Sequence, residues 1–236
     1  LEEQKDHLNI LKFSSEHMLN LINDILDLSK LEAEKIQLEK NVVDIPNFIN
    51  KVASPFIPQY DEKNVLFEIE IDENLKRPIL TDSTRLNQVL TNLLSNALKF
   101  TINGSVKLIV KGLSIKSDVN NIEFSVIDTG IGISEDNKKK IFEQFAQADV
   151  KTTRRYGGTG LGLTISQKLV GLMGGELKVE SKYNKGSRFY FNIEVPVHMG
   201  RQKAFINDKD LLKNEGRLKG LRILIAEDNA INMMIA

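Results

Sequence analysis

The sequence predicts an α/β protein in which a long coiled-coil-like helix precedes a domain of interleaved strands and helices. Three observations lead to this prediction. Apolar residues in the N-terminal segment recur at steps of three and four, and several later runs alternate between apolar and polar residues as half-buried strands do. Two glycine clusters, one behind an aspartate and one ahead of a helical pattern, flank a polar segment in the middle of the chain.

The composition narrows the range of functions. The 236 residues hold one large domain or two modest ones, and 32 basic residues balance 32 acidic ones, so no overall field attracts nucleic acid or an anionic membrane. The absence of cysteine excludes a disulfide scaffold and a thiolate zinc site. No apolar run approaches the roughly 20 residues that cross a bilayer, and no signal-peptide pattern opens the chain. We expect this part of the protein to be cytoplasmic, whether or not its parent is anchored in a membrane.

The N-terminal segment carries a heptad-like apolar stripe without proline or glycine. It predicts a helix from about residue 4 to residue 36, roughly 50 Å long at 1.5 Å per residue. One isolated helix cannot bury a stripe this wide, so partner helices are required. The stripe comprises Leu1, Leu8, Leu11, Met18, Ile22 and Ile25, widened by Leu19, Leu26 and Leu28.

The remaining elements follow in order. The run 42–46 breaks the helical pattern, and a short amphipathic helix follows at 48–53. Asp82 or Ser83 can cap a helix whose apolar face runs through residues 86–98, and a further helix is expected at 163–172. Alternation and β-branched content predict strands at 65–71, 122–127, 176–181 and 188–195, the last two joined by a turn at 184–186.

Asn92, Asn96 and Lys99 step by four and three along the helix that follows the cap. They therefore share one face and can converge on one ligand. A solvated polar stripe has the same spacing. The spacing by itself leaves both interpretations open.

Asp128 stands at the C-terminal end of the strand predicted at 122–127, directly ahead of Gly130 and Gly132. The second glycine cluster, residues 157–162, opens the helix expected at 163–172. Glycines at a helix start leave backbone N–H groups bare, and these groups together with the helix dipole bind phosphate. Turns and helix caps also use aspartate and glycine. Two clusters on either side of a polar segment favour a phosphate-binding site over an ordinary pair of turns.

Four blocks, in this order and at this spacing, resemble the ATP-binding domain of sensor histidine kinases, in the wider gyrase, Hsp90 and MutL group of ATPases. The blocks are residues 92–101, 128–132, 142–145 and 158–162. The resemblance covers roughly residues 1–198. It implies a two-layer α/β sandwich, with a mixed sheet covered by helices on one face. It also implies a protein histidine kinase that uses ATP and Mg²⁺.

The resemblance assigns roles to individual residues. Asn96 would supply an oxygen to Mg²⁺ with support from Asn92, while Phe100 would lie near the nucleoside. Asp128 would accept from the adenine 6-amino group, joined by the hydroxyl of Ser187. Residues 134–159 would form a lid, and Phe142 and Phe145 would anchor it to the domain or dock on the phosphotransfer helices. Lys99 and Arg154 are the candidates for stabilising phosphate. The implied nucleotide contacts are completed by Gly130, Gly132, Ile133, Gly158, Thr159, Gly160, Leu161 and Gly162.

Asn92 also bears on the mechanism. In the gyrase and Hsp90 branch, a glutamate one turn before the magnesium asparagine activates water, whereas an amide cannot take up a proton at neutral pH. This difference favours transfer of the γ-phosphate to a histidine. An ATP-hydrolysing clamp of the gyrase or MutL kind and a non-catalytic nucleotide-sensing scaffold remain as alternatives.

Residues 1–41 resemble the second helix of the dimerisation and phosphotransfer hairpin, which implies a homodimer through this helix. The phospho-accepting histidine of the family lies on the first helix, in a His-Glu box that this sequence lacks. We therefore expect His7, His17 and His198 to be surface or seam residues, and this chain alone to be unable to autophosphorylate.

The domain organisation follows from these segments. Residues 42–198 would form the ATP-binding kinase domain, and the polar stretch 199–219 a linker. Residues 220–236 open with a buried-type strand that ends in Glu227 and Asp228. This strand resembles the first strand of a response-regulator receiver domain, cut short. A hybrid kinase is therefore implied, with a receiver domain or response regulator as its partner in a phosphorelay.

Overall fold

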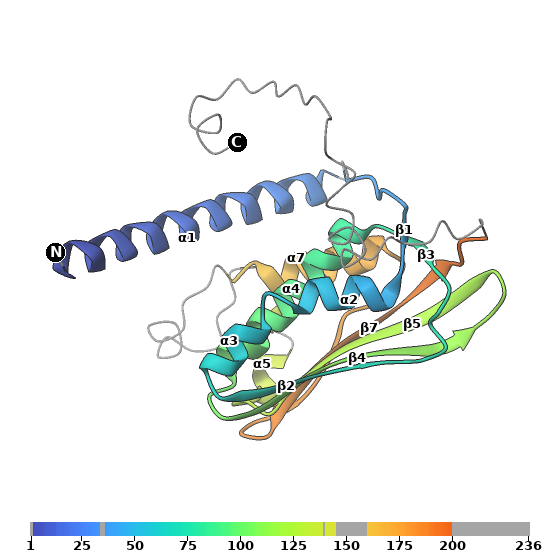
Figure 1. Cartoon of the computed structure of the whole chain (residues 1–236). Coiled ribbons are helices and arrows are strands. Elements are labelled where there is room, and N and C mark those ends of the chain that lie inside the picture. Colours follow the sequence, from blue (N-terminus) through green and yellow to red (C-terminus); the bar gives the residue numbers. More distant parts are fainter. Residues whose placement is uncertain (1, 34–35, 139, 145–159, 200–236) are drawn as a thin grey trace, which may run out of the picture. The chain divides into compact units, whose positions relative to one another are not determined.

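The computed structural model describes residues 2–33, 36–138, 140–144 and 160–199 (Figure 1). The chain divides into two compact units, residues 1–198 and 199–236. All the helices and strands described below belong to the first unit. The strand predicted to begin a receiver domain, at residues 220–236, lies outside the described residues.

Helix α1 (Glu2–Glu32) is the long N-terminal helix that the apolar stripe predicts. It ends at Glu32 rather than near residue 36, because Ile36 leaves the helical path and packs, partly buried, against the core of the following domain. Within the described ranges, no helix combines the length and the apolar character needed to cross a bilayer.

The domain is built on a five-stranded sheet with the strand order β2-β4-β5-β7-β6. Strands β2 and β4 run parallel and the other neighbours run antiparallel, so the sheet is mixed. Two short strands, β1 (Asn41–Val43) and β3 (Ile79–Thr81), pair separately. The five main strands are β2 (Val65–Ile71), β4 (Gly104–Ile115), β5 (Val119–Asp128), β6 (Lys178–Lys182) and β7 (Gly186–Pro196).

Helices cover one face of this sheet (Figure 1). The expected two-layer α/β sandwich with a mixed sheet is therefore confirmed. Two short helical turns, α5 (Glu135–Lys138) and η1 (Lys140–Phe142), lie in the segment expected to form the lid. The covering helices are α2 (Ile45–Ala53), α3 (Ile57–Glu62), α4 (Ser83–Phe100) and α7 (Gly162–Leu172).

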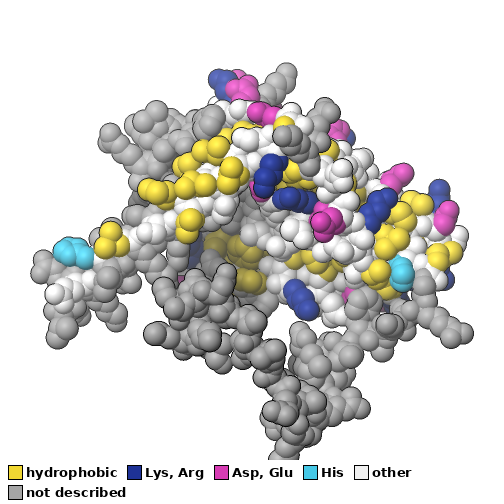
Figure 2. Space-filling model, turned by 90° about the horizontal axis from the view of Figure 1, so that it is seen from above, with side chains coloured by type: hydrophobic (Ala, Val, Ile, Leu, Met, Phe, Trp, Pro, Cys, Tyr) yellow, Lys and Arg dark blue, Asp and Glu magenta, His cyan; other side chains and the backbone are white. Residues whose placement is uncertain are grey.

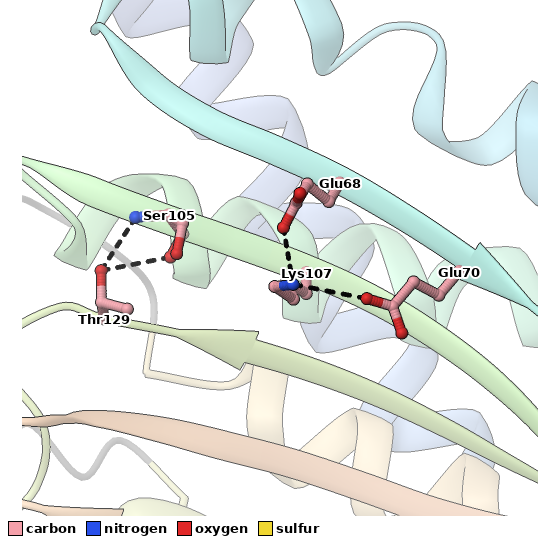
Figure 3. Close-up of polar contacts among 5 residues, drawn as sticks. All are labelled: Glu68, Glu70, Ser105, Lys107 and Thr129. Carbon is pink, nitrogen blue, oxygen red and sulfur yellow. Dashed lines mark hydrogen bonds and ion pairs between the residues drawn. The ribbon is translucent and has the colours of Figure 1, made fainter.

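Alternation along β4 separates the core from the outer face. Val106, Leu108 and Val110 have no exposed surface and belong to the hydrophobic core. Lys107 points to the other side, where its Nζ lies 2.7 Å from Glu68 and 3.3 Å from Glu70 on the neighbouring strand β2 (Figure 3). These groups are well exposed, so the pairs align β2 with β4 but add little stability.

Helix α4 is fixed at both ends. Of the two predicted cap residues, Asp82 is the N-cap, and its carboxylate accepts from the backbone N–H of Arg85 at 2.9 Å. Near the other end, the Tyr60 hydroxyl donates to the Leu94 carbonyl at 2.9 Å, and Lys63 Nζ donates to the Leu98 carbonyl at 3.0 Å. Burial and the negative charge of Asp128 hold the pKa of Tyr60 far above its ordinary value, so the hydroxyl remains a donor.

Helix α1 is attached to the domain near its C-terminal end. Leu28 and Leu31 join the core cluster, and Asp27 accepts from Gln88 Nε2 on α4 at 2.8 Å. Glu32 accepts from Gln144 Nε2 at 2.8 Å and lies 3.5 Å from Lys168 Nζ on α7. The preceding turns of α1 leave apolar side chains exposed. In the view from above, apolar side chains are visible along this helix (Figure 2). These exposed residues are Leu11, Met18, Leu19, Ile22, Ile25 and Leu26.

Candidate functional site

The polar face of α4 meets the start of α7. Nδ2 of Asn92 donates to Ser166 Oγ at 2.9 Å, and Nδ2 of Asn96 donates to Oδ1 of Asn92 at 3.4 Å. One turn farther along, Lys99 Nζ lies 4.8 Å from the centre of the Phe100 ring. Partial burial lowers the pKa of Lys99. Asn92, Asn96 and Lys99 therefore form a polar strip along one face of α4, with Ser166 against Asn92 and the Phe100 ring beside Lys99.

Asp128 is a buried carboxylate at the end of β5, with only 7% of its surface exposed. It pairs with Ser187 across the β5–β7 ladder, and its Oδ1 accepts from the Gly130 N–H at 2.8 Å. Burial raises the pKa of Asp128, while hydrogen bonds from the backbone N–H groups of Gly130 and Ser187 oppose that rise. The structure thus holds a desolvated acceptor at the C-terminal end of the central strand β5.

The backbone after Asp128 is pressed against its surroundings so closely that two positions have no room for a side chain. A Cβ at Gly130 would lie 2.3 Å from the Phe100 carbonyl oxygen at the end of α4. Gly132 has φ 62°, and a Cβ there would lie 2.1 Å from the Lys182 carbonyl oxygen. The Ile131 N–H donates to the Phe100 carbonyl at 3.3 Å. The first glycine cluster therefore joins the end of β5 to the end of the Asn-bearing helix.

Hydroxyl groups complete this corner. Ser181 and Ser187 are cross-strand partners with their Oγ atoms 3.0 Å apart, and Ser181 Oγ also accepts from the Ile133 N–H at 2.7 Å. On the opposite side, the Thr129 hydroxyl accepts from the Ser105 N–H at 2.9 Å (Figure 3). The sequence analysis did not identify Ser181. Its position opposite Ser187, across the predicted turn at 184–186, is the signal that could have found it.

The second glycine cluster also reaches α4. Helix α7 starts at Gly162, and its N-cap residue Leu161 is buried and makes no side-chain capping bond. A Cβ at Gly162 would lie 2.3 Å from Asn92 Oδ1. Gly160 has φ 72°, which favours glycine. The start of α7 and the polar strip of α4 are therefore direct neighbours.

Part of the predicted site lies outside the described residues: Arg154, Gly158 and Thr159, with the lid residue Phe145. Phe142, the other predicted lid anchor, is partly buried against the core, and its carbonyl accepts from the Thr164 hydroxyl on α7 at 3.0 Å. The fold brings all the other predicted site residues to one region, at the ends of β5 and α4 and the starts of β7 and α7.

The polar groups in this region fit a nucleotide with a bound Mg²⁺ ion. Among the described residues, no group of three or more His, Cys, Asp or Glu side chains can hold a metal ion. The oxygens near α7 are amide oxygens, which suit Mg²⁺, an ion that keeps several waters and phosphate oxygens as ligands. At the other end, the buried carboxylate of Asp128 is an acceptor that suits the amino group of a base.

Comparison with known proteins agrees with this geometry. Residues 81–197 match the family described as histidine kinase-, DNA gyrase B-, and HSP90-like ATPase. The chain is 39% identical over 195 residues to the signal transduction histidine-protein kinase BarA of Escherichia coli (strain K12). This alignment covers 83% of the chain and 21% of BarA. It is 40% identical over 237 residues to the autoinducer 2 sensor kinase/phosphatase LuxQ of Vibrio vulnificus (strain YJ016). This alignment covers 99% of the chain and 27% of LuxQ. The chain thus spans about a quarter of the length of these relatives.

Solved structures give the same result. Full-length ShkA in complex with AMPPNP is similar with a TM-score of 0.72 and 34% identity, over 84% of this chain and 40% of that chain. The catalytic domain of histidine kinase ThkA is similar with a TM-score of 0.55 and 31% identity, over 67% of this chain and 95% of that one. Nearly all of a histidine kinase catalytic domain is therefore matched within this chain. The protein belongs to the histidine kinase-, DNA gyrase B- and HSP90-like ATPase family, and it carries a histidine kinase catalytic domain.

Proposed function

We propose that this domain binds Mg-ATP and donates the γ-phosphate to a histidine in two-component signalling. One observation carries the proposal. The buried carboxylate of Asp128 is joined through the Phe100 carbonyl to the helix that presents Asn92 and Asn96. An acceptor for a base and oxygen ligands for a metal thus lie at the two ends of one surface.

The base at the Asp128 end is adenine. A buried carboxylate has acceptors only, so it requires a donor from its ligand. Adenine offers its 6-amino group at this position, whereas guanine presents a carbonyl oxygen. Ser187 stands beside Asp128 in the ladder and contributes its hydroxyl to the same corner. Phe100 and Ile133 flank the nucleoside.

The phosphates lie toward α7. Asn96 supplies the oxygen that binds Mg²⁺, and the ion neutralises charge on the phosphates. Asn92 supports Asn96, and Lys99 faces the phosphates, as does Arg154 from the lid. Backbone N–H groups of the second glycine cluster donate hydrogen bonds to the remaining phosphate oxygens.

The nucleophile is a histidine rather than water. Asn92 stands where a hydrolytic enzyme needs a general base, and its Nδ2 is a donor to Ser166. On α1, His7 lies about 30 Å along the helix axis from Asp27, the residue that contacts α4, at 1.5 Å per residue. Neither His7 nor His17 stands in a His-Glu box, so we place the acceptor on another helix.

Partners follow from the same surfaces. The exposed apolar side chains of α1 pair with the same helix of a second copy, which makes the protein a homodimer. The parent protein passes phosphate to a receiver domain or response regulator. Residues 220–236 begin such a receiver domain.

A phosphotransfer assay tests the proposal. The chain is mixed with labelled ATP, Mg²⁺ and a separate hairpin peptide that carries a His-Glu box. We expect acid-labile, base-stable label on the histidine of the hairpin and little free phosphate. Release of free phosphate without labelled hairpin would favour the hydrolysing clamp instead. Nucleotide binding with neither product would favour a sensing scaffold.

A further inference from the structure

Helix α4 is not the only element that holds Asn92 and Asn96. Ser166 lies on the facing helix α7 with 1% of its surface exposed, and its Oγ accepts from Asn92 Nδ2 at 2.9 Å. Asn92 Oδ1 in turn accepts from Asn96 Nδ2 at 3.4 Å. The three side chains form one line of hydrogen bonds that crosses from α7 to α4 and continues one turn along α4.

This line has a direction, because the two ends of a primary amide differ. The oxygen accepts and the nitrogen donates, so fixing one end fixes the other. Ser166 accepts from the nitrogen of Asn92, which turns the oxygen of Asn92 to Asn96. Asn96 donates from its own Nδ2 to that oxygen, so its Oδ1 faces away from Asn92. That oxygen is the atom a metal ion needs.

Close packing supports the same arrangement. A Cβ at Gly162 would lie 2.3 Å from Asn92 Oδ1, so the missing side chain lets α7 approach the amide of Asn92 directly. The neighbours of Ser166 on α7, Ile165 and Leu169, are buried in the core. The Ser166 hydroxyl is therefore presented to Asn92 from a rigid element.

We propose that Ser166 is a positioning residue, which orients the metal-binding oxygen of Asn96 through the amide of Asn92. The inference rests on the proposed function, in which Asn96 binds Mg²⁺. Groups that hold a metal ligand from behind typically contribute about 10- to 100-fold to metal affinity. Because the bond between Asn96 and Asn92 is long, we expect an effect of about 10-fold, at the lower end of that range.

The variant Ser166→Cys separates the hydrogen bond from the packing, because a thiol has the same shape as the hydroxyl and is only slightly larger, but it accepts weakly. The affinity of the whole chain for ATP is measured by calorimetry under reducing conditions, once in EDTA and once with saturating Mg²⁺. In the unaltered chain we expect Mg²⁺ to tighten ATP binding. In Ser166→Cys we expect this gain to shrink about 10-fold, with an unchanged affinity in EDTA.

Ser125 supplies a matched control. It is also a serine with 1% of its surface exposed, and its Oγ accepts one hydrogen bond, from Arg188 Nε at 3.0 Å, on the sheet. Ser125→Cys makes the same chemical change away from α4, so it should keep the full gain from Mg²⁺.

The outcomes distinguish the inference from the proposed function. A full Mg²⁺ gain in Ser166→Cys, or an equal loss of affinity with and without Mg²⁺, would overturn the inference and leave Mg-ATP binding in place. ATP binding by the unaltered chain that is indifferent to Mg²⁺ would overturn the metal role of Asn96 and the inference with it.

Discussion

Asp128 destabilises the nucleotide-free domain at neutral pH. Asp128 is 7% exposed, and burial raises the pKa of its carboxyl group above the ordinary value of 3.8. A carboxyl whose pKa is raised by folding stabilises the fold below the unfolded-state pKa, and this contribution is lost as the pH rises through the folded-state pKa. Above that window the ionised carboxylate lowers the free energy of unfolding, and a hydrogen-bond donor on a bound ligand can offset this loss.

Asp128→Asn should therefore separate stability from binding. We expect the nucleotide-free variant to melt at a higher temperature than the unaltered chain at pH 7, and the difference to shrink as the pH falls to about 4. Its ATP affinity should fall by about 1–3 kcal/mol, because an amide nitrogen replaces an acceptor that faces the adenine amino group. Calorimetry and thermal melts across pH measure both effects. Unchanged ATP affinity would exclude Asp128 as the adenine anchor.

Asn96→Ala should remove the dependence of ATP binding on Mg²⁺ more than it destabilises the fold. Asn96 is half-buried and its described hydrogen bond is 3.4 Å long, so we expect a change in the free energy of unfolding within about 0.5 kcal/mol. Asn87→Ala, an exposed asparagine on the same helix, is the control and should leave both quantities unchanged. A much lower melting temperature with intact Mg²⁺ dependence would make Asn96 a structural residue.

Residues of the site differ in how far the sequence reveals them. Asn92, Asn96 and Asp128 could be predicted because their spacing along one helix, or their place between a strand and a glycine, is local. Ser166 could not, because it meets Asn92 only where two separate helices pack together. The place of Ser181 opposite Ser187 follows from the predicted turn, but its contact with Ile133 joins distant segments and could not be predicted.

At the scale of elements, the C-terminal turns of α1 attach to the domain by apolar contact more than by charge. Leu28 and Leu31 are 8% and 9% exposed, whereas half of the Glu32 side chain that pairs with Lys168 is exposed, at 50%. Exposed ion pairs contribute less than about 1 kcal/mol, and a buried leucine contributes more.

Leu31→Ala should therefore loosen α1 more than Glu32→Gln. We expect the leucine variant to cost about 2 kcal/mol and to speed hydrogen exchange in the last turns of α1. The glutamate variant should cost less than about 1 kcal/mol. Exchange measured by mass spectrometry, with the core strands as internal reference, checks both. A larger effect from Glu32→Gln would show that charge holds the helix.

The sequence patterns identify long regular elements and lose short or interrupted ones. The strand predicted at 65–71 coincides with β2, and Asp82, one of the two predicted cap residues, caps α4. Strand β4 was not predicted, because Ile109 interrupts its alternation and a bulge lies at residues 112–114. Strands β1 and β3 have three residues each, too few to show a period. The order β2-β4-β5-β7-β6 depends on pairing between distant segments, which local patterns do not record.

At the scale of the whole molecule, the chain alone should neither label itself from ATP nor hydrolyse ATP appreciably. The sequence holds no His-Glu box, and the proposed function has Asn92 in the place of a water-activating base. A general base contributes about 10²- to 10⁴-fold, so only slow background hydrolysis is expected. Incubation with radioactive ATP, followed by acid and base treatment of the protein, measures both activities.

Asn92→Glu sharpens this prediction, since it adds a carboxylate one turn from Asn96. A modest gain in hydrolysis would support the assignment of Asn92. Acid-labile, base-stable label on His7 or His17 of the unaltered chain would contradict it, because the acceptor would then lie on α1 itself.

The central claim is that Asp128 selects adenine in a nucleotide site built by α4, β5, β7 and α7. Calorimetric titration of the intact chain with Mg-ATP and with Mg-GTP tests it most directly. We expect saturable binding of one ATP per chain. Binding of GTP should be at least about 10-fold weaker, because the guanine carbonyl would leave the buried carboxylate without a donor. Equal affinity for the two nucleotides, or no binding of ATP, would contradict this claim.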